Sequence, residues 1–171
     1  MTGVQTCALP IWDPLDEAAV TAIVDGTLAA YYDKIIKTLV ANTDIPILIH
    51  GYDHPIPDGR GDTLLIATSG PWLSLIFEQR GYDLIGNADH RTLARDVMRR
   101  VYDRINATVK RVAAAYPNRA YHVNLTGTLA QNFGNPDKYQ LLWNDELHPN
   151  EQGFDLLAAP IAKQLKDLRI G

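Results

Sequence analysis

The sequence contains a single cysteine, Cys7, which excludes an intramolecular disulfide and a CxxC metal pair. It also lacks any apolar run near the roughly 20 residues that a membrane-spanning helix needs, and its mean hydropathy is slightly negative at −0.15. There is no basic block, since 16 Lys and Arg stand against 20 Asp and Glu for a formal net charge of −4. We therefore expect neither a membrane span nor a nucleic-acid partner.

The composition that remains is that of a soluble globular domain, or part of one, with 171 residues, 46% apolar and 21% charged. Apolar residues at spacings of three and four predict a helix from Asp13-Pro14 to about Asn42, a long helix over about 90–115, and a last helix after Pro149 that Pro160 interrupts. In the first helix the stripe expected to face the core is Val20, Val24, Leu28, Tyr31, Ile35 and Leu39.

Two short apolar runs, Ile45–Tyr52 and Tyr121–Leu125, read as strands, and the first is apolar enough to be covered on both faces of a parallel sheet. A loop over 53–62 follows the first strand, and a lid or insertion is expected over 63–81. This alternation predicts an α/β fold with a parallel sheet. Because two strands are too few for such a sheet, we expect N-terminal strands to be missing upstream, and the chain to aggregate or resemble a molten globule when expressed alone.

The segment WNDELHPNEQGF, residues 143–154, carries Asp145 and His148 three residues apart in front of the last helix. A carboxylate fixes the tautomer of an imidazole and stabilises its protonated form, while the other ring nitrogen takes a proton from a hydroxyl. This pair is the best candidate for chemistry in the sequence.

The pattern D-x-x-H-P-x-x-x-G-F resembles the final sequence block of the SGNH (GDSL-type) hydrolases. HVNLTGTL at 122–129 and ILIHGYDHPIPDGR at 47–60 resemble a strand with its turn and a central strand with its loop in one branch of that family, in the same order. The resemblance implies a flavodoxin-like three-layer αβα fold and cofactor-free hydrolysis of acyl or acetyl esters of small molecules or carbohydrates. It makes His148 the general base and Asp145 its orienting carboxylate.

Other blocks of that family are absent. The family carries its nucleophilic serine in an N-terminal G-D-S block and an oxyanion-hole asparagine in G-x-N-D, whereas this chain has only Ser69 and Ser74 and reads Gly-Asn-Ala-Asp at 86–89. Each missing oxyanion donor is worth about 2.7–4 kcal/mol of barrier. The resemblance therefore implies that residues 12–171 are a partial SGNH domain, inactive by itself, and that the hydrolase function belongs to a parent protein.

The first eleven residues, MTGVQTCALPI, lack the features of a secretory signal. Residues 2–11 resemble the in-frame translation of a common sequencing adapter that ends in one further T, and the Trp12 codon begins with T. We expect this segment to be an artefact, with a genuine disordered tail as the alternative. On either interpretation the cellular compartment stays open.

Several alternatives stay open from the sequence. Ser69 is a possible nucleophile, although a loop serine is more often a turn residue. His50, Asp53 and His54 form an H-x-x-D-H group that could supply metal ligands together with His148, but the spacing matches no known metal motif, so no metal is expected. Asp53 is instead predicted as a substrate contact, because ligands bind at the ends of parallel strands.

The rival to the hydrolase is a non-enzymatic α/β binding domain in which Asp145 and His148 merely cap the last helix. The geometry of the pair separates the two: in a hydrolase, Asp145 bonds to the His148 ring and the other ring nitrogen faces open space.

Overall fold

The computed structural model describes residues 14–64, 67–129 and 139–169. The N-terminal residues, including the expected adapter segment and Cys7, lie outside the described part. In chain order the elements are α1 (Glu17–Val20), the π-helix η1 (Thr21–Leu28), α2 (Ala29–Asn42), β1 (Ile47–His50), β2 (Asp62–Leu64), β3 (Ala67–Ser69), α3 (Ser74–Glu78), α4 (Ala88–Ala114), β4 (Ala120–Val123), the 3-10 helix η3 (Tyr139–Leu142) and α5 (Glu151–Asp167).

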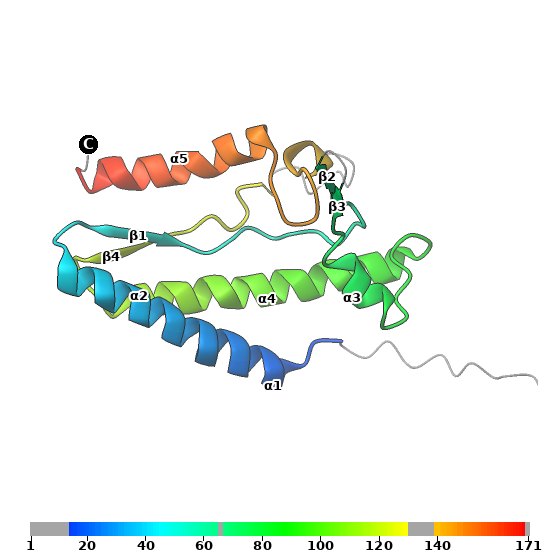
Figure 1. The fold of residues 1–171 in the computed structure, drawn as a ribbon, viewed down its shortest axis with the longest axis horizontal. Coiled ribbons are helices and arrows are strands. Elements are labelled where there is room, and N and C mark those ends of the chain that lie inside the picture. The colour runs from blue at the N-terminus through cyan, green and yellow to red at the C-terminus, as the bar shows by residue number, and fades with distance from the viewer. Residues whose placement is uncertain (1–13, 65–66, 130–138, 170–171) are drawn as a thin grey trace, which may run out of the picture.

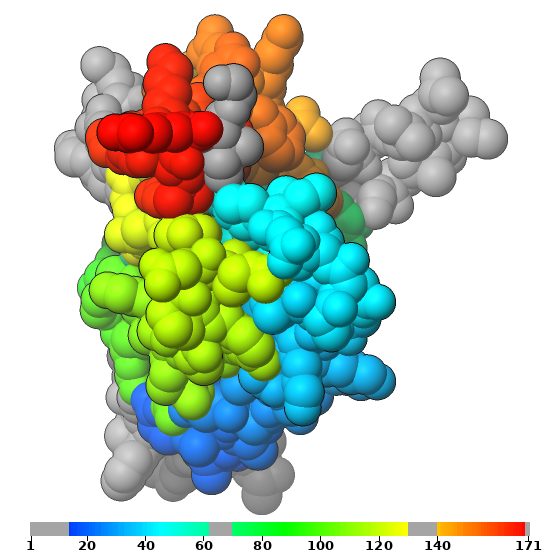
Figure 2. All heavy atoms as spheres, turned by 90° about the vertical axis from the view of Figure 1, so that its left-hand side faces the viewer, coloured from blue at the N-terminus to red at the C-terminus, as the bar shows by residue number. Residues whose placement is uncertain are grey.

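A small two-stranded parallel sheet lies at the centre of the fold. β1 pairs with β4 in a register that sets Ile47 against Ala120 and His50 against Val123. Helices α2 and α4 lie on one side of this sheet and α5 on the other (Figure 1). The end-on view shows the red and orange atoms of α5 at the top, with the yellow-green end of α4 and the cyan and blue atoms of α2 below them (Figure 2). The chain is therefore a mixed α/β structure, as the alternation of elements predicted.

Each face of the sheet has its own apolar core. On the α5 side, Val123 of β4 packs with Leu125, Leu129, Trp143 and Leu157. On the other side, the buried residues of the cluster are Ala29, Ile36, Val112, Ala113 and Ala120. Since side chains alternate along a strand, neighbouring residues of β1 and β4 supply both cores.

The predicted core stripe of the first helix is wrong in its second half. Tyr31, Ile35 and Leu39 are 62%, 55% and 41% exposed, whereas Ala29 and Ile36 are buried. The π-helical turns of η1 are the physical reason, because an i→i+5 turn takes up more residues than an α turn and rotates everything after it. The helix also begins later than predicted: the Asp16 carboxylate caps α1 by accepting from Ala19 N–H at 3.0 Å, and Asn42 ends α2 as expected.

Charged pairs attach this first helical segment to α4. Asp25, in the π-helix, accepts from Arg104 Nη2 at 2.6 Å and from Thr108 Oγ1 at 2.6 Å. The hydrogen bonds from Thr108 and Arg104 lower the pKa of Asp25. The π-helix thus directs a carboxylate onto α4, and Val24 is its buried apolar residue.

Several other elements differ from the expectations or add detail to them. β1 is shorter than predicted and is only partly covered, with His50 exposed instead of buried. The segment over 63–81 contains an antiparallel hairpin, β2 with β3, before α3. α5 runs through Pro160 without restarting, and Phe154, in its first turn, is 54% exposed.

Apolar side chains remain on the surface of the described part. Besides the stripe on α2, Ile23, Ile45, Ile85 and Leu141 are each more than 60% exposed. Among the described helices, none is long and apolar enough to cross a membrane.

Candidate active site

The segment from Trp143 to Pro149 forms a closed loop between η3 and α5. Trp143 and Pro149 make an antiparallel bridge, and Asn144 N–H donates to His148 O at 2.8 Å. At the base of the loop, Asn150 N–H donates to Leu142 O at 3.0 Å. The loop therefore returns on itself and holds residues 145 and 148 close together.

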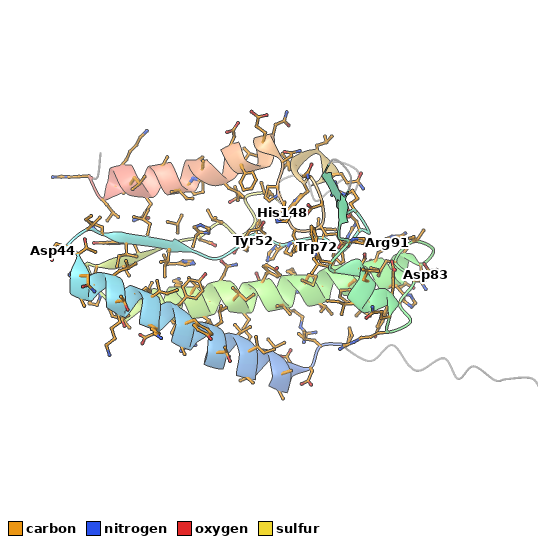
Figure 3. The ribbon with its side chains drawn as sticks, in the orientation of Figure 1. Asp44, Tyr52, Trp72, Asp83, Arg91 and His148 are labelled. Atoms are coloured by element: carbon orange, nitrogen blue, oxygen red, sulfur yellow. The ribbon has the colours of Figure 1, made fainter. Side chains whose placement is uncertain are left out.

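Asp145 and His148 are in direct contact, as the spacing predicted. His148 Nδ1 lies 2.9 Å from Asp145 Oδ2 and 3.1 Å from Oδ1. The Asp145 side chain is fully buried, whereas the His148 side chain is 57% exposed. In the part of the chain that the structure describes, Nε2 of His148 has no hydrogen-bond partner. The carboxylate is thus buried, whereas the imidazole that it contacts is largely exposed, at the position labelled in Figure 3.

The electrostatics of Asp145 favour its charged form. Burial raises the pKa of the Asp145 carboxyl, but hydrogen bonds from the His148 ring and from Leu147 N–H and His148 N–H outweigh burial, so that the pKa lies below its ordinary value. The two backbone donors lie 2.7 and 2.8 Å from Oδ1. A charged carboxylate against Nδ1 fixes a proton on that nitrogen and leaves Nε2 free to accept one.

Two side chains from the segment after β1 donate hydrogen bonds to the backbone of the loop over 143–149. The Tyr52 hydroxyl, just beyond β1, donates to Leu147 O, and Arg60 Nη1 donates to Trp143 O at 2.8 Å. Burial raises the pKa of Tyr52 to about 12, so this phenol stays a hydrogen-bond donor at neutral pH. The pair consequently lies beyond the carboxyl end of β1, where parallel sheets place ligands.

Gly153 explains why the start of α5 packs so closely on this loop. A Cβ at that position would lie 2.3 Å from Leu142 O, which is closer than any side-chain atom can approach a backbone oxygen. The Asn150 side chain caps α5 by accepting from Gly153 N–H at 3.0 Å. The cap of the last helix is therefore Asn150, and not Asp145 or His148 as the rival hypothesis supposed.

Two neighbours of the pair were not assigned to this site from the sequence. The indole of Trp72 lies edge-on to the His148 ring with centroids 5.4 Å apart. Glu146 received no role at all, yet its side chain is fully buried and accepts four backbone N–H groups. No pattern in the sequence pointed to the burial of Glu146, because an acidic residue in a loop is usually exposed.

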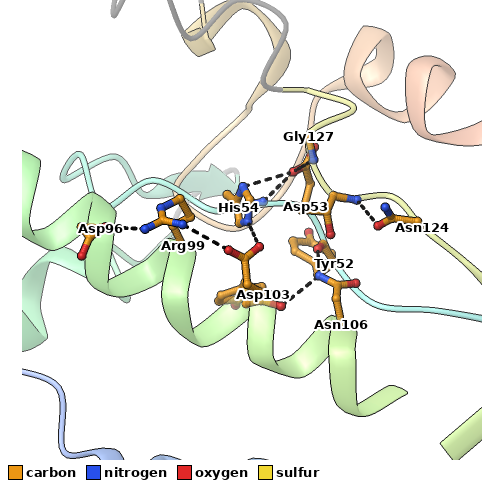
Figure 4. Close-up of polar contacts among 11 residues, drawn as sticks. Tyr52, Asp53, His54, Asp96, Arg99, Asp103, Asn106, Asn124 and Gly127 are labelled. Carbon is orange, nitrogen blue, oxygen red and sulfur yellow. Dashed lines mark hydrogen bonds and ion pairs between the residues drawn. The ribbon is translucent and has the colours of Figure 1, made fainter. Parts of the chain in front are cut away.

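Asp53 was predicted as a substrate contact. In the structure it is 2% exposed, and its carboxylate accepts from Gly127 N–H and Leu129 N–H, both at 2.7 Å, and from His54 N–H at 2.8 Å. These contacts fasten the segment after β4 to the end of β1 (Figure 4). Its geometry gives Asp53 a structural task, and the substrate contact stays a prediction without support from the structure.

The suggested H-x-x-D-H metal group does not converge. His50 is exposed and its Nδ1 lies 2.6 Å from Gly51 O, whereas His54 Nε2 pairs with Asp103 of α4 at 2.7 Å. Across the described residues, no group of three His, Cys, Asp or Glu side chains has the geometry to hold a metal ion.

The two serines are placed differently. Ser69 ends β3 opposite Asp62, and its side chain lies outside the described part of the structure. Ser74 is fully buried and gives its backbone N–H to Glu146. The nucleophile that the pair would serve is therefore not identified among the described side chains.

Comparisons with known protein families, with curated proteins and with solved structures find no match to this chain. The functional assignment consequently depends on the geometry of the site.

Proposed function

We propose that this chain carries the acid–base half of a serine-esterase active site, as its resemblance to the SGNH hydrolases implies. The observation that carries the proposal is the contact between a fully buried Asp145 and an exposed His148, 2.9 Å from Oδ2 to Nδ1, with no hydrogen-bond partner on Nε2 among the described residues. A pair that served only to stabilise the loop would gain nothing from leaving the ring exposed.

In the proposed reaction, Nε2 of His148 takes the proton from a serine hydroxyl as that oxygen attacks the ester carbonyl. The same nitrogen then gives the proton to the departing alcohol. Asp145 keeps the proton of the neutral ring on Nδ1 and stabilises the imidazolium that forms between the two transfers. No cofactor is needed, and the substrates are acyl or acetyl esters of small molecules or carbohydrates.

The proposal includes a flavodoxin-like three-layer fold. Helices on both sides of a parallel β1–β4 pair support it, as does the place of the candidate loop beyond the carboxyl end of β1. Further strands beside this pair would complete such a sheet.

The test begins with the genomic DNA around codon 12, read in frame through the segment that encodes MTGVQTCALPI. The protein encoded by that uninterrupted frame, called the genomic protein below, is then expressed and assayed with p-nitrophenyl acetate and with a fluorophosphonate probe that labels activated serines. His148→Asn should abolish hydrolysis and labelling. His50→Asn, the same change at an exposed histidine outside the site, should leave both unchanged.

The rival is a non-enzymatic binding domain. It is favoured if the genomic frame supplies no G-D-S serine, or if the genomic protein shows no hydrolysis and no probe labelling.

A further inference from the structure

Glu146 is a buried carboxylate surrounded by backbone donors. Oε1 accepts from Gly59 N–H at 2.9 Å and Ser74 N–H at 3.0 Å. Oε2 accepts from Trp72 N–H at 2.7 Å and Leu73 N–H at 2.8 Å. No cation contacts it among the described residues, so amide donors alone compensate the cost of burying this charge.

These donors come from two segments distant in the sequence, the loop after β1 and the turn that leads into α3. Glu146 itself belongs to the loop that carries the candidate pair. One side chain thus joins three segments, and its neighbours Asp145 and His148 move with it. The turn held at Trp72–Ser74 is the same one that presents an indole to His148, with the two ring planes at 81° (Figure 3).

We propose that Glu146 is a positioning residue that acts on His148 through Trp72. By fixing the backbone at Trp72, the carboxylate holds the indole against the imidazole. The indole limits the rotation of the exposed ring and shields one side of it from water. The consequence for ester hydrolysis rests on the proposed function, whereas the contact between the two rings can be tested without it.

Glu146→Gln is the sharpest substitution, because it keeps the shape of the side chain. Whichever oxygen becomes the amide nitrogen, two of the four N–H donors then face another donor, so half of the anchor is lost. Glu78→Gln is the matched control, the same change at an exposed glutamate of α3. Trp72→Ala removes the indole but keeps the backbone N–H that Glu146 binds, and Trp72→Phe keeps an aromatic ring.

The first measurement is the rate at which diethylpyrocarbonate modifies His148 in the genomic protein, followed by peptide mass spectrometry with exposed His50 as the internal reference. E146Q and W72A should both accelerate the modification of His148 relative to His50. E78Q should not, and W72F should remain close to the wild type. An unchanged rate in W72A overturns the proposal, and this arm is valid even if E146Q fails to fold or the protein hydrolyses no ester.

The second measurement is a double-mutant cycle on p-nitrophenyl acetate hydrolysis. A displacement of about 1 Å at a catalytic group can cost about 100-fold, and we expect E146Q and W72A each to lower kcat by about 10- to 100-fold with little change in KM. If Glu146 acts through Trp72, E146Q has no further effect in the W72A background. Equal losses in both backgrounds mean that Glu146 acts independently of Trp72, and they refute the proposal.

Discussion

Replacing Asp145 by asparagine should keep the loop folded but reverse the tautomer of the His148 ring. The carboxamide oxygen can take the position of Oδ1 and continue to accept from Leu147 N–H and His148 N–H, now at 2.7 and 2.8 Å. The amide NH2 then replaces Oδ2, which lies 2.9 Å from Nδ1. Because the NH2 group then occupies the shorter of the two contacts with Nδ1, 2.9 Å against 3.1 Å for Oδ1, we expect Nδ1 to become an acceptor and the ring proton to move to Nε2.

The magnitudes of the two effects differ. With its proton on Nε2, His148 can no longer accept one from a nucleophile, and the loss expected for a wrong tautomer is about 10⁴ in kcat, or roughly 5.5 kcal/mol. The stability cost is smaller, about 1.5–3 kcal/mol for one charge-assisted hydrogen bond. Asp145→Ala should reduce activity as much but stability further, because each of the two stranded backbone donors costs about 1–3 kcal/mol.

Nitrogen NMR of the labelled genomic protein shows which ring nitrogen of His148 carries the proton, with the signals assigned by their loss in His148→Asn. Hydrolysis rates and urea unfolding of both variants complete the comparison. A D145N protein that keeps its proton on Nδ1, or that retains activity within about tenfold of the wild type, would refute the role given to this carboxylate.

Three further predictions concern the pH dependence of stability, the Tyr52 hydroxyl and the exposed apolar stripe of α2. Folding lowers the pKa of Asp145. Its contribution to stability is therefore complete above its unfolded pKa of about 3.9 and is lost as the pH falls through the folded value. Below about pH 4, the free energy of unfolding should fall less steeply in D145N than in the wild type. Tyr52→Phe removes the donor to Leu147 O and should cost about 0.5–1.5 kcal/mol in urea unfolding; it should also delete a tyrosine that ionises near pH 12 in an absorbance titration. Ile35→Lys combined with Leu39→Glu should reduce the aggregation of the 171-residue chain and its binding of a hydrophobic dye, since each exposed apolar side chain offers roughly 1 kcal/mol of association. Unchanged aggregation, or a sharp cooperative unfolding transition of the unaltered monomer, would contradict the importance of the exposed apolar stripe on α2.

The long helices and the two central strands could be predicted because each is set by a local, uninterrupted pattern. α4 spans Ala88–Ala114, close to the predicted 90–115, since its apolar residues keep one period throughout. The buried face of the first helix could not be predicted, because a π-helical turn changes the phase without any break in the apolar pattern. Ile36 is buried and Ile35 exposed for this reason, although both are isoleucines in the same helix.

One part of the candidate site could likewise be predicted from the sequence, and another part could not. Asp145 and His148 meet because a short closed loop brings residues three apart together, and that much is visible in the sequence. The partners of Glu146 lie 72 to 87 residues away, at positions where any residue except proline supplies the same N–H. No side-chain pattern marks a backbone donor, so the anchor of the site has no signature in the sequence.

Asp145 and Glu146 are consecutive, both are fully buried, and they serve opposite sides of one loop. Asp145 binds the ring and the backbone of its own loop, whereas Glu146 binds segments from elsewhere in the chain. Both residues lie in the bent segment between Trp143 and Pro149, and the bend turns their side chains toward different partners. Partly exposed ion pairs such as Asp25–Arg104 are screened by salt, but buried hydrogen bonds between carboxylates and backbone amides are screened much less. The position of His148 therefore depends on fixed backbone dipoles, which do not have to reorganise when the ring gains or loses a proton.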